Sequence, residues 1–241
     1  GLLATSAVLA DDADSEGWQF VQENGRTYYK KGDIKETDWR VIDGKTYYFD
    51  HVSGEMVVGW QYIPAPHEGV TIGSSLRQDI AFRPDWFYFG QDGVLQDFVG
   101  KQVLEAKTAT NTNKHHGEQY DSPAEKRTYY FEDQRSYHTL KTGWISDEGH
   151  WYYLQKDSGF DARIDSLTVG EPVRGWTNDN STWYYLDPTT AAMQTGWKYL
   201  GNKWYYLRSS GAMATGWYQE GSSWYYLDAE NGDMKTGWQY L

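Results

Sequence analysis

The sequence has 241 residues, a net charge of −12 and no cysteine. The negative charge argues against a nucleic-acid-binding surface, because phosphate contacts need clustered lysine and arginine. Without cysteine, neither disulfides nor thiolate metal sites are available. The apolar content is concentrated in 13 tryptophans, 21 tyrosines and 8 phenylalanines rather than in aliphatic residues, and this balance is unusual for an ordinary core.

The first ten residues, GLLATSAVLA, resemble the end of a secretory signal peptide. The apolar stretch is followed by Val8-Leu9-Ala10, which fits a cleavage site. A tag or cloning remnant is the alternative explanation. No run of about 18 apolar residues follows, so no transmembrane helix is expected.

Residues 11–142 contain degenerate repeats with insertions. The segments 17–37, GWQFVQENGRTYYKKGDIKET, and 38–58, DWRVIDGKTYYFDHVSGEMVV, keep a period of 21 residues. Two further units can be traced, one through Trp60 and Trp86 and the other through Thr128-Tyr129-Tyr130-Phe131. Segments of about 63–85 and 99–127 interrupt the pattern, and a third insertion covers about 161–174.

Residues 143–241 contain regular repeats, of which the last is incomplete. The segments 175–195, 196–215 and 216–236 align almost without gaps, and 143–160 begins in the same way. Each unit opens with Gly-Trp, and a second tryptophan follows seven residues later in the run Trp-Tyr-Tyr-Leu. The last four leading tryptophans are spaced by 21, 20 and 21 residues: Trp176, Trp197, Trp217 and Trp238. Such regularity predicts a repeat architecture.

Each unit predicts a β-hairpin. The run Trp204-Tyr205-Tyr206-Leu207 has high strand propensity, and Gly201-Asn202 supplies the turn before it. Alternation places Trp204 and Tyr206 on one face and Tyr205 on the other. Because a lone hairpin is marginally stable in water, successive hairpins are expected to stack. The predicted fold is therefore an all-β solenoid of stacked β-hairpins whose degenerate N-terminal repeats carry loop insertions.

The sequence of Gly-Trp, Trp-Tyr-Tyr-Leu and Gly-Ala-Met resembles the choline-binding repeats of pneumococcal cell-surface proteins. The resemblance covers the chain after residue 16 and is strongest from residue 143 onward. It implies a hairpin solenoid, and it implies choline or phosphocholine as the ligand, with no cofactor. In this family a pocket uses both tryptophans of one repeat and the second tyrosine of the next, with a methionine at its floor.

Carried over by motif, the resemblance implies two complete pockets and three weaker ones. The complete pockets are Trp176, Trp183, Met193 and Tyr206, followed by Trp197, Trp204, Met213 and Tyr226. The weaker ones are Trp144, Trp151 and Tyr185; Trp217, Trp224 and Met234; and Trp60, Trp86 and Tyr130. The first tyrosines of the motif, Tyr184, Tyr205 and Tyr225, are expected in the solenoid core because they lie on the opposite strand face.

The chemistry of choline supports this ligand independently. A quaternary ammonium has no N–H donor, so a carboxylate cannot hydrogen-bond it, whereas faces of tryptophan and tyrosine can surround and attract it. The expected partners are choline-decorated teichoic and lipoteichoic acids, with a host protein or another wall protein as a further partner of the irregular half. The expected location is outside the cell, attached non-covalently to the bacterial wall.

The alternative functions are a glucan-binding repeat protein and an enzyme. A glucan-binding repeat protein is the main alternative, because GKTYYFD at 44–50 resembles glucan-binding repeats. An enzyme is not expected, since no segment is long enough for a separate catalytic domain. His115-His116 could belong to a metal site, but a solvated loop explains the pair better, so no metal is expected. Gly44-Lys45-Thr46 lacks the earlier glycine of a phosphate-binding loop.

Overall fold

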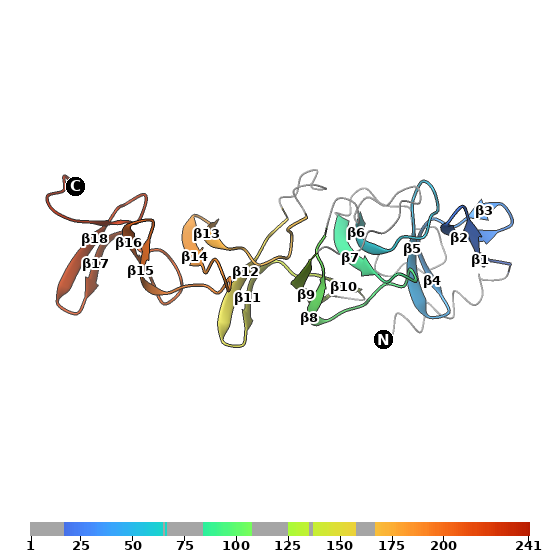
Figure 1. Ribbon diagram of the computed structural model, residues 1–241, viewed down its shortest axis with the longest axis horizontal. Coiled ribbons are helices and arrows are strands. Elements are labelled where there is room, and N and C mark those ends of the chain that lie inside the picture. Colours follow the sequence, from blue (N-terminus) through green and yellow to red (C-terminus); the bar gives the residue numbers. More distant parts are fainter. Residues whose placement is uncertain (1–16, 65, 67–83, 108–124, 135–136, 158–166) are drawn as a thin grey trace. The chain divides into compact units, whose positions relative to one another are not determined.

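The computed structural model describes residues 17–64, 66, 84–107, 125–134, 137–157 and 167–241. The expected signal-peptide remnant at 1–10 and the pair His115-His116 lie outside these ranges. The described residues form strands and turns but no helix, and most strands pair in antiparallel hairpins (Figure 1). The predicted all-β architecture of hairpins is confirmed.

The chain divides into two compact units. Unit 1 contains residues 1–141 and 157–170, and unit 2 contains residues 142–156 and 171–241. The degenerate repeats therefore lie in unit 1 and the regular ones in unit 2.

The described residues of unit 1 form ten strands, and each of these pairs with near neighbours in the chain. They are β1 (Gln19–Glu23), β2 (Arg26–Lys31), β3 (Ile34–Lys35), β4 (Asp38–Ile42), β5 (Lys45–Phe49), β6 (Gly59–Pro64), β7 (Pro84–Phe89), β8 (Gly100–Glu105), β9 (Lys126–Gln134) and β10 (Tyr137–Leu140). The expected insertion at 63–85 falls between the two strands of the β6–β7 hairpin. Within the segment expected as an insertion at about 99–127, Gly100–Glu105 forms β8 and pairs with β9.

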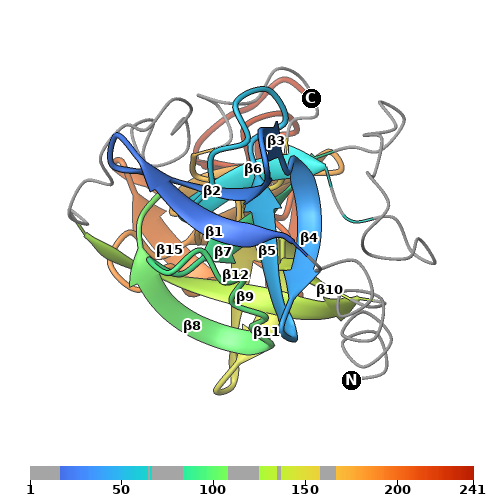
Figure 2. The same ribbon diagram turned by 90° about the vertical axis from the view of Figure 1, so that its right-hand side faces the viewer.

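The core of unit 1 is aromatic. Phe49, Phe89 and Phe131 each lie opposite the first residue of their hairpin, and all three are buried. Figure 2 shows the β1–β2 hairpin beside the β4–β5 hairpin. The ring centroids of Phe20 in β1 and Tyr47 in β5 are 5.2 Å apart. Stacked hairpins thus bury their rings against one another, which a single hairpin could not do.

Unit 2 contains four hairpins and a short final strand. They are β11 (Gly143–Asp147) with β12 (His150–Leu154), β13 (Gly175–Asp179) with β14 (Thr182–Leu186), β15 (Gly196–Leu200) with β16 (Lys203–Leu207), β17 (Gly216–Glu220) with β18 (Ser223–Leu227), and β19 (Met234–Lys235). The leucine that ends each second strand is fully buried. These leucines take the place that phenylalanine holds in unit 1.

The turn of the β15–β16 hairpin explains why the chain reverses there. Gly201 and Asn202 both have positive φ, at 55° and 64°. A two-residue turn with both central residues in this region matches the twist of the flanking strands, and glycine and asparagine adopt it most easily. The turn fixes the register, in which Trp197 lies opposite Tyr206.

Backbone hydrogen bonds join each repeat to the one before it. The amide of Met213 donates to the carbonyl of Trp183 at 2.8 Å, and that of Met193 donates to Trp151 at the same distance. In unit 1, Met56 donates to Thr27 in the same way, again at 2.8 Å. Degenerate and regular repeats therefore share one stacking geometry, although Thr27 stands where later repeats have tryptophan.

Candidate functional site

Each hairpin of unit 2 contains a cross-strand pair of aromatic residues, and these pairs are the first component of the candidate site. The leading tryptophan lies directly opposite the second tyrosine of its own repeat, as in the pair Trp176 and Tyr185. Residues opposite each other project from the same face of a hairpin. The rings of Trp176 and Tyr185 accordingly meet edge to face at 5.1 Å.

The next hairpin supplies the wall across from the leading tryptophan. Trp176 contacts Tyr205 of the following repeat at 4.9 Å, with the rings at 63° to each other. The same contact joins Trp197 to Tyr225 at 4.9 Å and Trp144 to Tyr184 at 4.8 Å. Unit 2 thus contains three aromatic groups in which the leading tryptophan of one repeat contacts the first tyrosine of the next.

These contacts differ from the expected grouping by one residue. Tyr206 lies against Trp197 of its own repeat rather than against Trp176, and Tyr226 lies against Trp217. Likewise Tyr185 contacts Trp176 and not Trp144. The expectation that Tyr184, Tyr205 and Tyr225 lie in the solenoid core stays a prediction, and in the structure each of them contacts the leading tryptophan of the preceding repeat. These tyrosines lie on the strand face opposite to that of the second tyrosines, as expected. In the stack of hairpins, that face contacts the leading tryptophan of the preceding repeat.

The second tryptophan of three of these repeats is exposed to solvent. Trp151, Trp183 and Trp204 are 48%, 41% and 42% exposed, whereas the rings behind them are more buried. Large exposed tryptophans at a repeated position are costly to display in water, and they indicate a surface that meets a ligand. The hydrogen bond from Met213 to the carbonyl of Trp183 fixes the strand that carries this ring.

Methionine lies at the same boundary between repeats. A Cβ atom placed on Gly211 would overlap the sulfur and side-chain carbons of Met193, and one on Gly232 would overlap those of Met213. Each methionine side chain therefore packs on the loop of the following repeat. The third group, around Trp144, has Pro172 in the corresponding bridge position, so it lacks this methionine.

Two of the groups include a carboxylate that the sequence analysis missed. The indole nitrogen of Trp144 donates to Asp179 at 3.0 Å, and that of Trp197 donates to Glu220 at 3.0 Å. Asp179 also accepts hydrogen bonds from the Tyr153 hydroxyl and the Lys156 ammonium. Both acids occupy the fifth position of their first strand, a spacing that could have pointed to them.

The hydrogen bonds to Asp179 alter its ionisation. Burial raises the pKa of its carboxyl, but the hydrogen bonds from Trp144 and Lys156 outweigh burial, and the pKa is lowered from its ordinary value of 3.8. The carboxylate is therefore ionised at neutral pH and holds the indole of Trp144 in place. It also places a negative charge beside an aromatic group.

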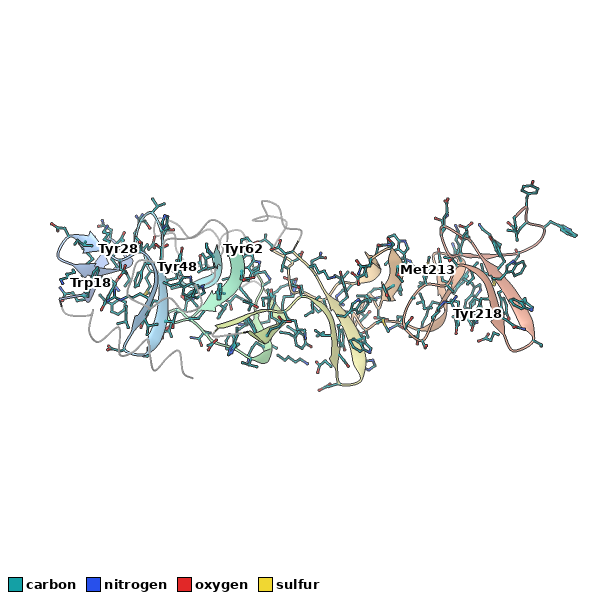
Figure 3. All side chains as sticks on the ribbon, turned by 180° about the vertical axis from the view of Figure 1, so that it is seen from behind. Trp18, Tyr28, Tyr48, Tyr62, Met213 and Tyr218 are labelled. Atoms are coloured by element: carbon teal, nitrogen blue, oxygen red, sulfur yellow. The ribbon has the colours of Figure 1, made fainter. Side chains whose placement is uncertain are left out.

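Tyr218 enlarges the group around Trp197. Its ring stacks on Tyr206 at 3.9 Å and meets Trp197 at 5.9 Å. A hydrogen bond with Tyr206 and partial burial raise the pKa of Tyr218 to about 12. Figure 3 shows Tyr218 and Met213 in this part of unit 2. The other hairpins of unit 2 have Ile145, Thr177 or Lys198 at this position, so the repeat pattern did not indicate Tyr218.

The last pair of tryptophans has fewer partners. Trp217 and Trp224 meet at 6.3 Å, and Trp217 also contacts Tyr226. No tyrosine from a following hairpin approaches them in the described part of the chain. Both rings are largely exposed. Met234, expected in this group, lies in β19 and pairs with Leu227 of β18.

The degenerate group in unit 1 is closed. Trp60 and Trp86 are 0% and 3% exposed, and Tyr129 of the next hairpin meets Trp60 at 4.8 Å. The expected member Tyr130 lies on the other face of β9, opposite Lys101. The burial of both tryptophans distinguishes this group from the open groups of unit 2.

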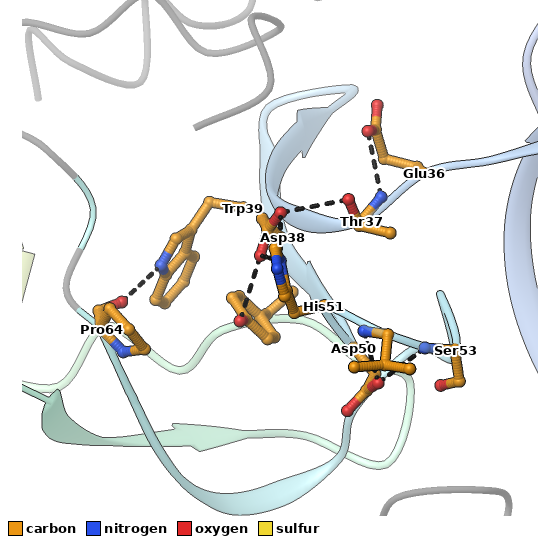
Figure 4. Close-up of polar contacts among 10 residues, drawn as sticks. Glu36, Thr37, Asp38, Trp39, Asp50, His51, Ser53 and Pro64 are labelled. Carbon is orange, nitrogen blue, oxygen red and sulfur yellow. Dashed lines mark hydrogen bonds and ion pairs between the residues drawn. The ribbon is translucent and has the colours of Figure 1, made fainter. Parts of the chain in front are cut away.

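The repeat around Trp39 is closed by polar contacts instead (Figure 4). Its indole nitrogen donates to the carbonyl of Pro64 at 2.8 Å. Asp38, which stands where other repeats have glycine, is buried with a φ of 67° and accepts hydrogen bonds from Thr37 and Tyr48. His51 lies 2.9 Å from the same carboxylate. The chain uses this position for structure, and no open tryptophan pair occurs there.

Neither a metal centre nor a membrane helix is found among the described residues. No group of three or more histidine, aspartate or glutamate side chains is placed to hold an ion in that part of the chain. The same part has no helix that is long and apolar enough to cross a membrane.

Comparisons with known proteins agree with this geometry. A choline-binding repeat family matches residues 194–238, and a cell wall binding repeat family matches 142–159 and 175–189. The structure of CbpJ from Streptococcus pneumoniae shares 60% identity and a TM-score of 0.78, over 93% of this chain and 75% of CbpJ. Choline-binding protein F (CbpF) of the same species, solved with a peptidoglycan analogue, shares 46% identity and a TM-score of 0.59, over 93% of this chain and 88% of CbpF. A comparison with curated protein sequences gave no match.

Proposed function

Because this chain belongs to the family of pneumococcal choline-binding proteins, a family of cell-surface proteins, we propose that unit 2 holds the choline groups of wall teichoic and lipoteichoic acids. Choline would enter between two successive hairpins. Two observations support these positions: a tryptophan–tyrosine contact spans two repeats three times, and each repeat that supplies the tryptophan also has an exposed second tryptophan.

The proposed binding residues are two tryptophans of one repeat and the first tyrosine of the next. They are Trp144, Trp151 and Tyr184; Trp176, Trp183 and Tyr205; and Trp197, Trp204 and Tyr225. Each ring face attracts a quaternary ammonium with about 0.5–2 kcal/mol. Three rings therefore provide a few kcal/mol, which corresponds to roughly millimolar affinity for one choline.

Repetition would turn these weak sites into firm attachment. A teichoic acid displays many choline groups, so after one has bound, the others are held at high local concentration. The carboxylates of Asp179 and Glu220 and the net charge of −12 repel the phosphates of the polymer. Attachment then depends on choline and not on general attraction to a polyanion.

The proposed role is attachment of a secreted protein to the wall without catalysis. Two acidic side chains at the aromatic groups, Asp179 and Glu220, accept hydrogen bonds from indole N–H groups, which suits orientation of the rings. Choline, rather than a cofactor, is the ligand proposed for these groups.

Titration with choline tests the proposal. Millimolar choline should quench or shift tryptophan fluorescence and raise Tm, because a ligand of the folded state stabilises it by mass action. Trp183→Ala should remove part of this response, and Trp238→Ala, which changes a fully exposed ring, serves as the control. A response to an α-glucan but not to choline would reject the proposal in favour of carbohydrate binding.

A further inference from the structure

The closed aromatic group of unit 1 contains a cation from the chain itself. The ammonium nitrogen of Lys107 lies 4.4 Å from the ring centroid of Tyr129, 4.9 Å from that of Trp60 and 5.3 Å from that of Trp86. All three distances fall within the range of a cation–π interaction. These rings hold the same repeat positions as Tyr205, Trp176 and Trp183 in unit 2.

Lys107 is fully enclosed in this cage of Trp60, Trp86 and Tyr129. Its exposure is 4%, and its ammonium also donates a hydrogen bond to the carbonyl of Val169 at 2.6 Å. A buried ammonium is unfavourable unless its charge and its donors are compensated. The three ring faces and the carbonyl contribute to that compensation. The cage therefore acts on Lys107 as a cation-binding site.

A second degenerate repeat shows a related arrangement. The guanidinium of Arg40 lies 5.3 Å from the ring of Trp18 and 5.6 Å from that of Tyr29. Arg40 is buried and forms an ion pair with Glu36 at 2.7 Å. Two basic side chains of unit 1 thus lie over the leading tryptophan of a repeat.

We propose that the Trp60–Trp86–Tyr129 cage is a cation site that the chain fills with Lys107, so that this repeat binds an internal ammonium in place of choline. The proposal rests on the proposed function only in that the cage is compared with the choline groups of unit 2. When Lys107 is shortened, the cage should accept a small external alkylammonium. A primary ammonium can also donate to the carbonyl of Val169, whereas a quaternary one has no N–H for this bond.

Chemical rescue of Lys107→Ala is the direct test. The variant should have a Tm lower than that of the wild type by roughly 5 °C or more, because the cage loses its cation and its filling. Propylammonium, which replaces the missing atoms, should raise the Tm of the variant and leave that of the wild type unchanged. After subtraction of its effect on the wild type, which arises from unit 2, tetramethylammonium should raise the Tm of the variant less than propylammonium does, and neutral propanol should not raise it. Lys45→Ala, which removes an exposed lysine, is the matched control.

Lys107→Met separates charge from packing and also tests the proposal if Lys107→Ala does not fold. Methionine fills the cage but carries no charge, so this variant should fold with a lowered Tm and show no response to propylammonium. The proposal would be overturned by a wild-type Tm in Lys107→Met, or by a response of Lys107→Ala to propylammonium no larger than that of Lys45→Ala. Choline titration of the wild type is a separate readout. Its failure would reject choline binding in unit 2 and would leave the rescue result intact.

Discussion

Trp176 and Tyr205 belong to successive hairpins, and their rings meet edge to face at 4.9 Å. Tyr205 projects from the strand face opposite to that of Tyr206, yet it is Tyr205 that reaches the preceding repeat. Neither hairpin alone contains the group that the two form together.

Replacing Tyr205 should therefore weaken choline binding in the Trp176 group. Trp151→Ala and Trp204→Ala remove the open tryptophan of the neighbouring groups and make the Trp176 group measurable by itself. In that background Tyr205→Ala should raise the Kd for choline at least about tenfold, or about 1.4 kcal/mol. Tyr206→Ala, the matched control, should change it less than about twofold, as measured by calorimetric titration. The reverse order would mean that the facing assigned to these tyrosines is incorrect.

Gly211 should tolerate alanine poorly. Its φ is 88°, and a new Cβ would overlap Met193. Gly211→Ala should lower the free energy of unfolding by about 2–3 kcal/mol, since backbone strain and overpacking add. Gly201→Ala, with φ of 55° and no neighbouring atom within 4 Å of the new Cβ, should lower it by only about 1 kcal/mol. Urea unfolding gives both values.

Met193→Ala provides the control for the Gly211 prediction. The double variant with Gly211→Ala should lose less free energy of unfolding than the sum of the two single losses, because the side chain that the new Cβ would overlap is gone. Strictly additive losses in the double variant would argue against packing of Met193 on this loop.

Asp179 should make unit 2 sensitive to acid. Its pKa in the folded protein is lowered from 3.8. A lowered pKa stabilises the fold above the ordinary value, and this contribution is lost as the pH falls through the lowered one. Wild-type stability should therefore decline below about pH 4 more steeply than that of Asp179→Asn. Thermal melts at several pH values give the slopes, and Glu230→Gln, an exposed change, is the control. Parallel slopes for wild type and Asp179→Asn would contradict the prediction.

Trp217 should contribute less to choline binding than Trp197. Trp197 contacts Tyr225 of a following hairpin, whereas no following hairpin approaches Trp217 in the described part of this chain. Trp197→Ala should abolish one choline equivalent in a calorimetric titration, and Trp217→Ala should leave the number of equivalents unchanged. Equal losses would mean that the Trp217 pair is completed by another molecule. Sedimentation at several concentrations would detect that association.

The sequence predicted the repeat, the hairpins and the paired tryptophans, because all of these depend on local spacing. The Trp-Tyr-Tyr-Leu run identified the second strand of each hairpin in unit 2, and Gly201-Asn202 identified a turn. The choice between Tyr205 and Tyr206 could not be made in this way. Alternation tells which residues share a face, but not which face meets the preceding hairpin.

The filled cage of unit 1 was also beyond sequence reasoning. Lys107 lies in the segment 99–127, which the repeat pattern predicts to be an insertion. It comes 47 residues after Trp60 and 62 residues before its acceptor Val169. Nothing in local spacing brings these residues together. The same holds for Asp179, which accepts a hydrogen bond from the indole of Trp144, 35 residues earlier in the chain.

The hydrogen bond from the Met213 amide to the Trp183 carbonyl has a consequence for how such proteins grow. The loop of each repeat donates this bond to the strand that carries the second tryptophan of the repeat before it. A site therefore belongs to the junction between two successive repeats, which we call a joint, and a single repeat does not contain one. A row of regular repeats then has one site fewer than it has hairpins. Duplication of any internal repeat inserts one hairpin and creates one additional joint with both of its walls. Gene duplication can therefore lengthen the array by one complete site at a time, without the need to evolve a new wall.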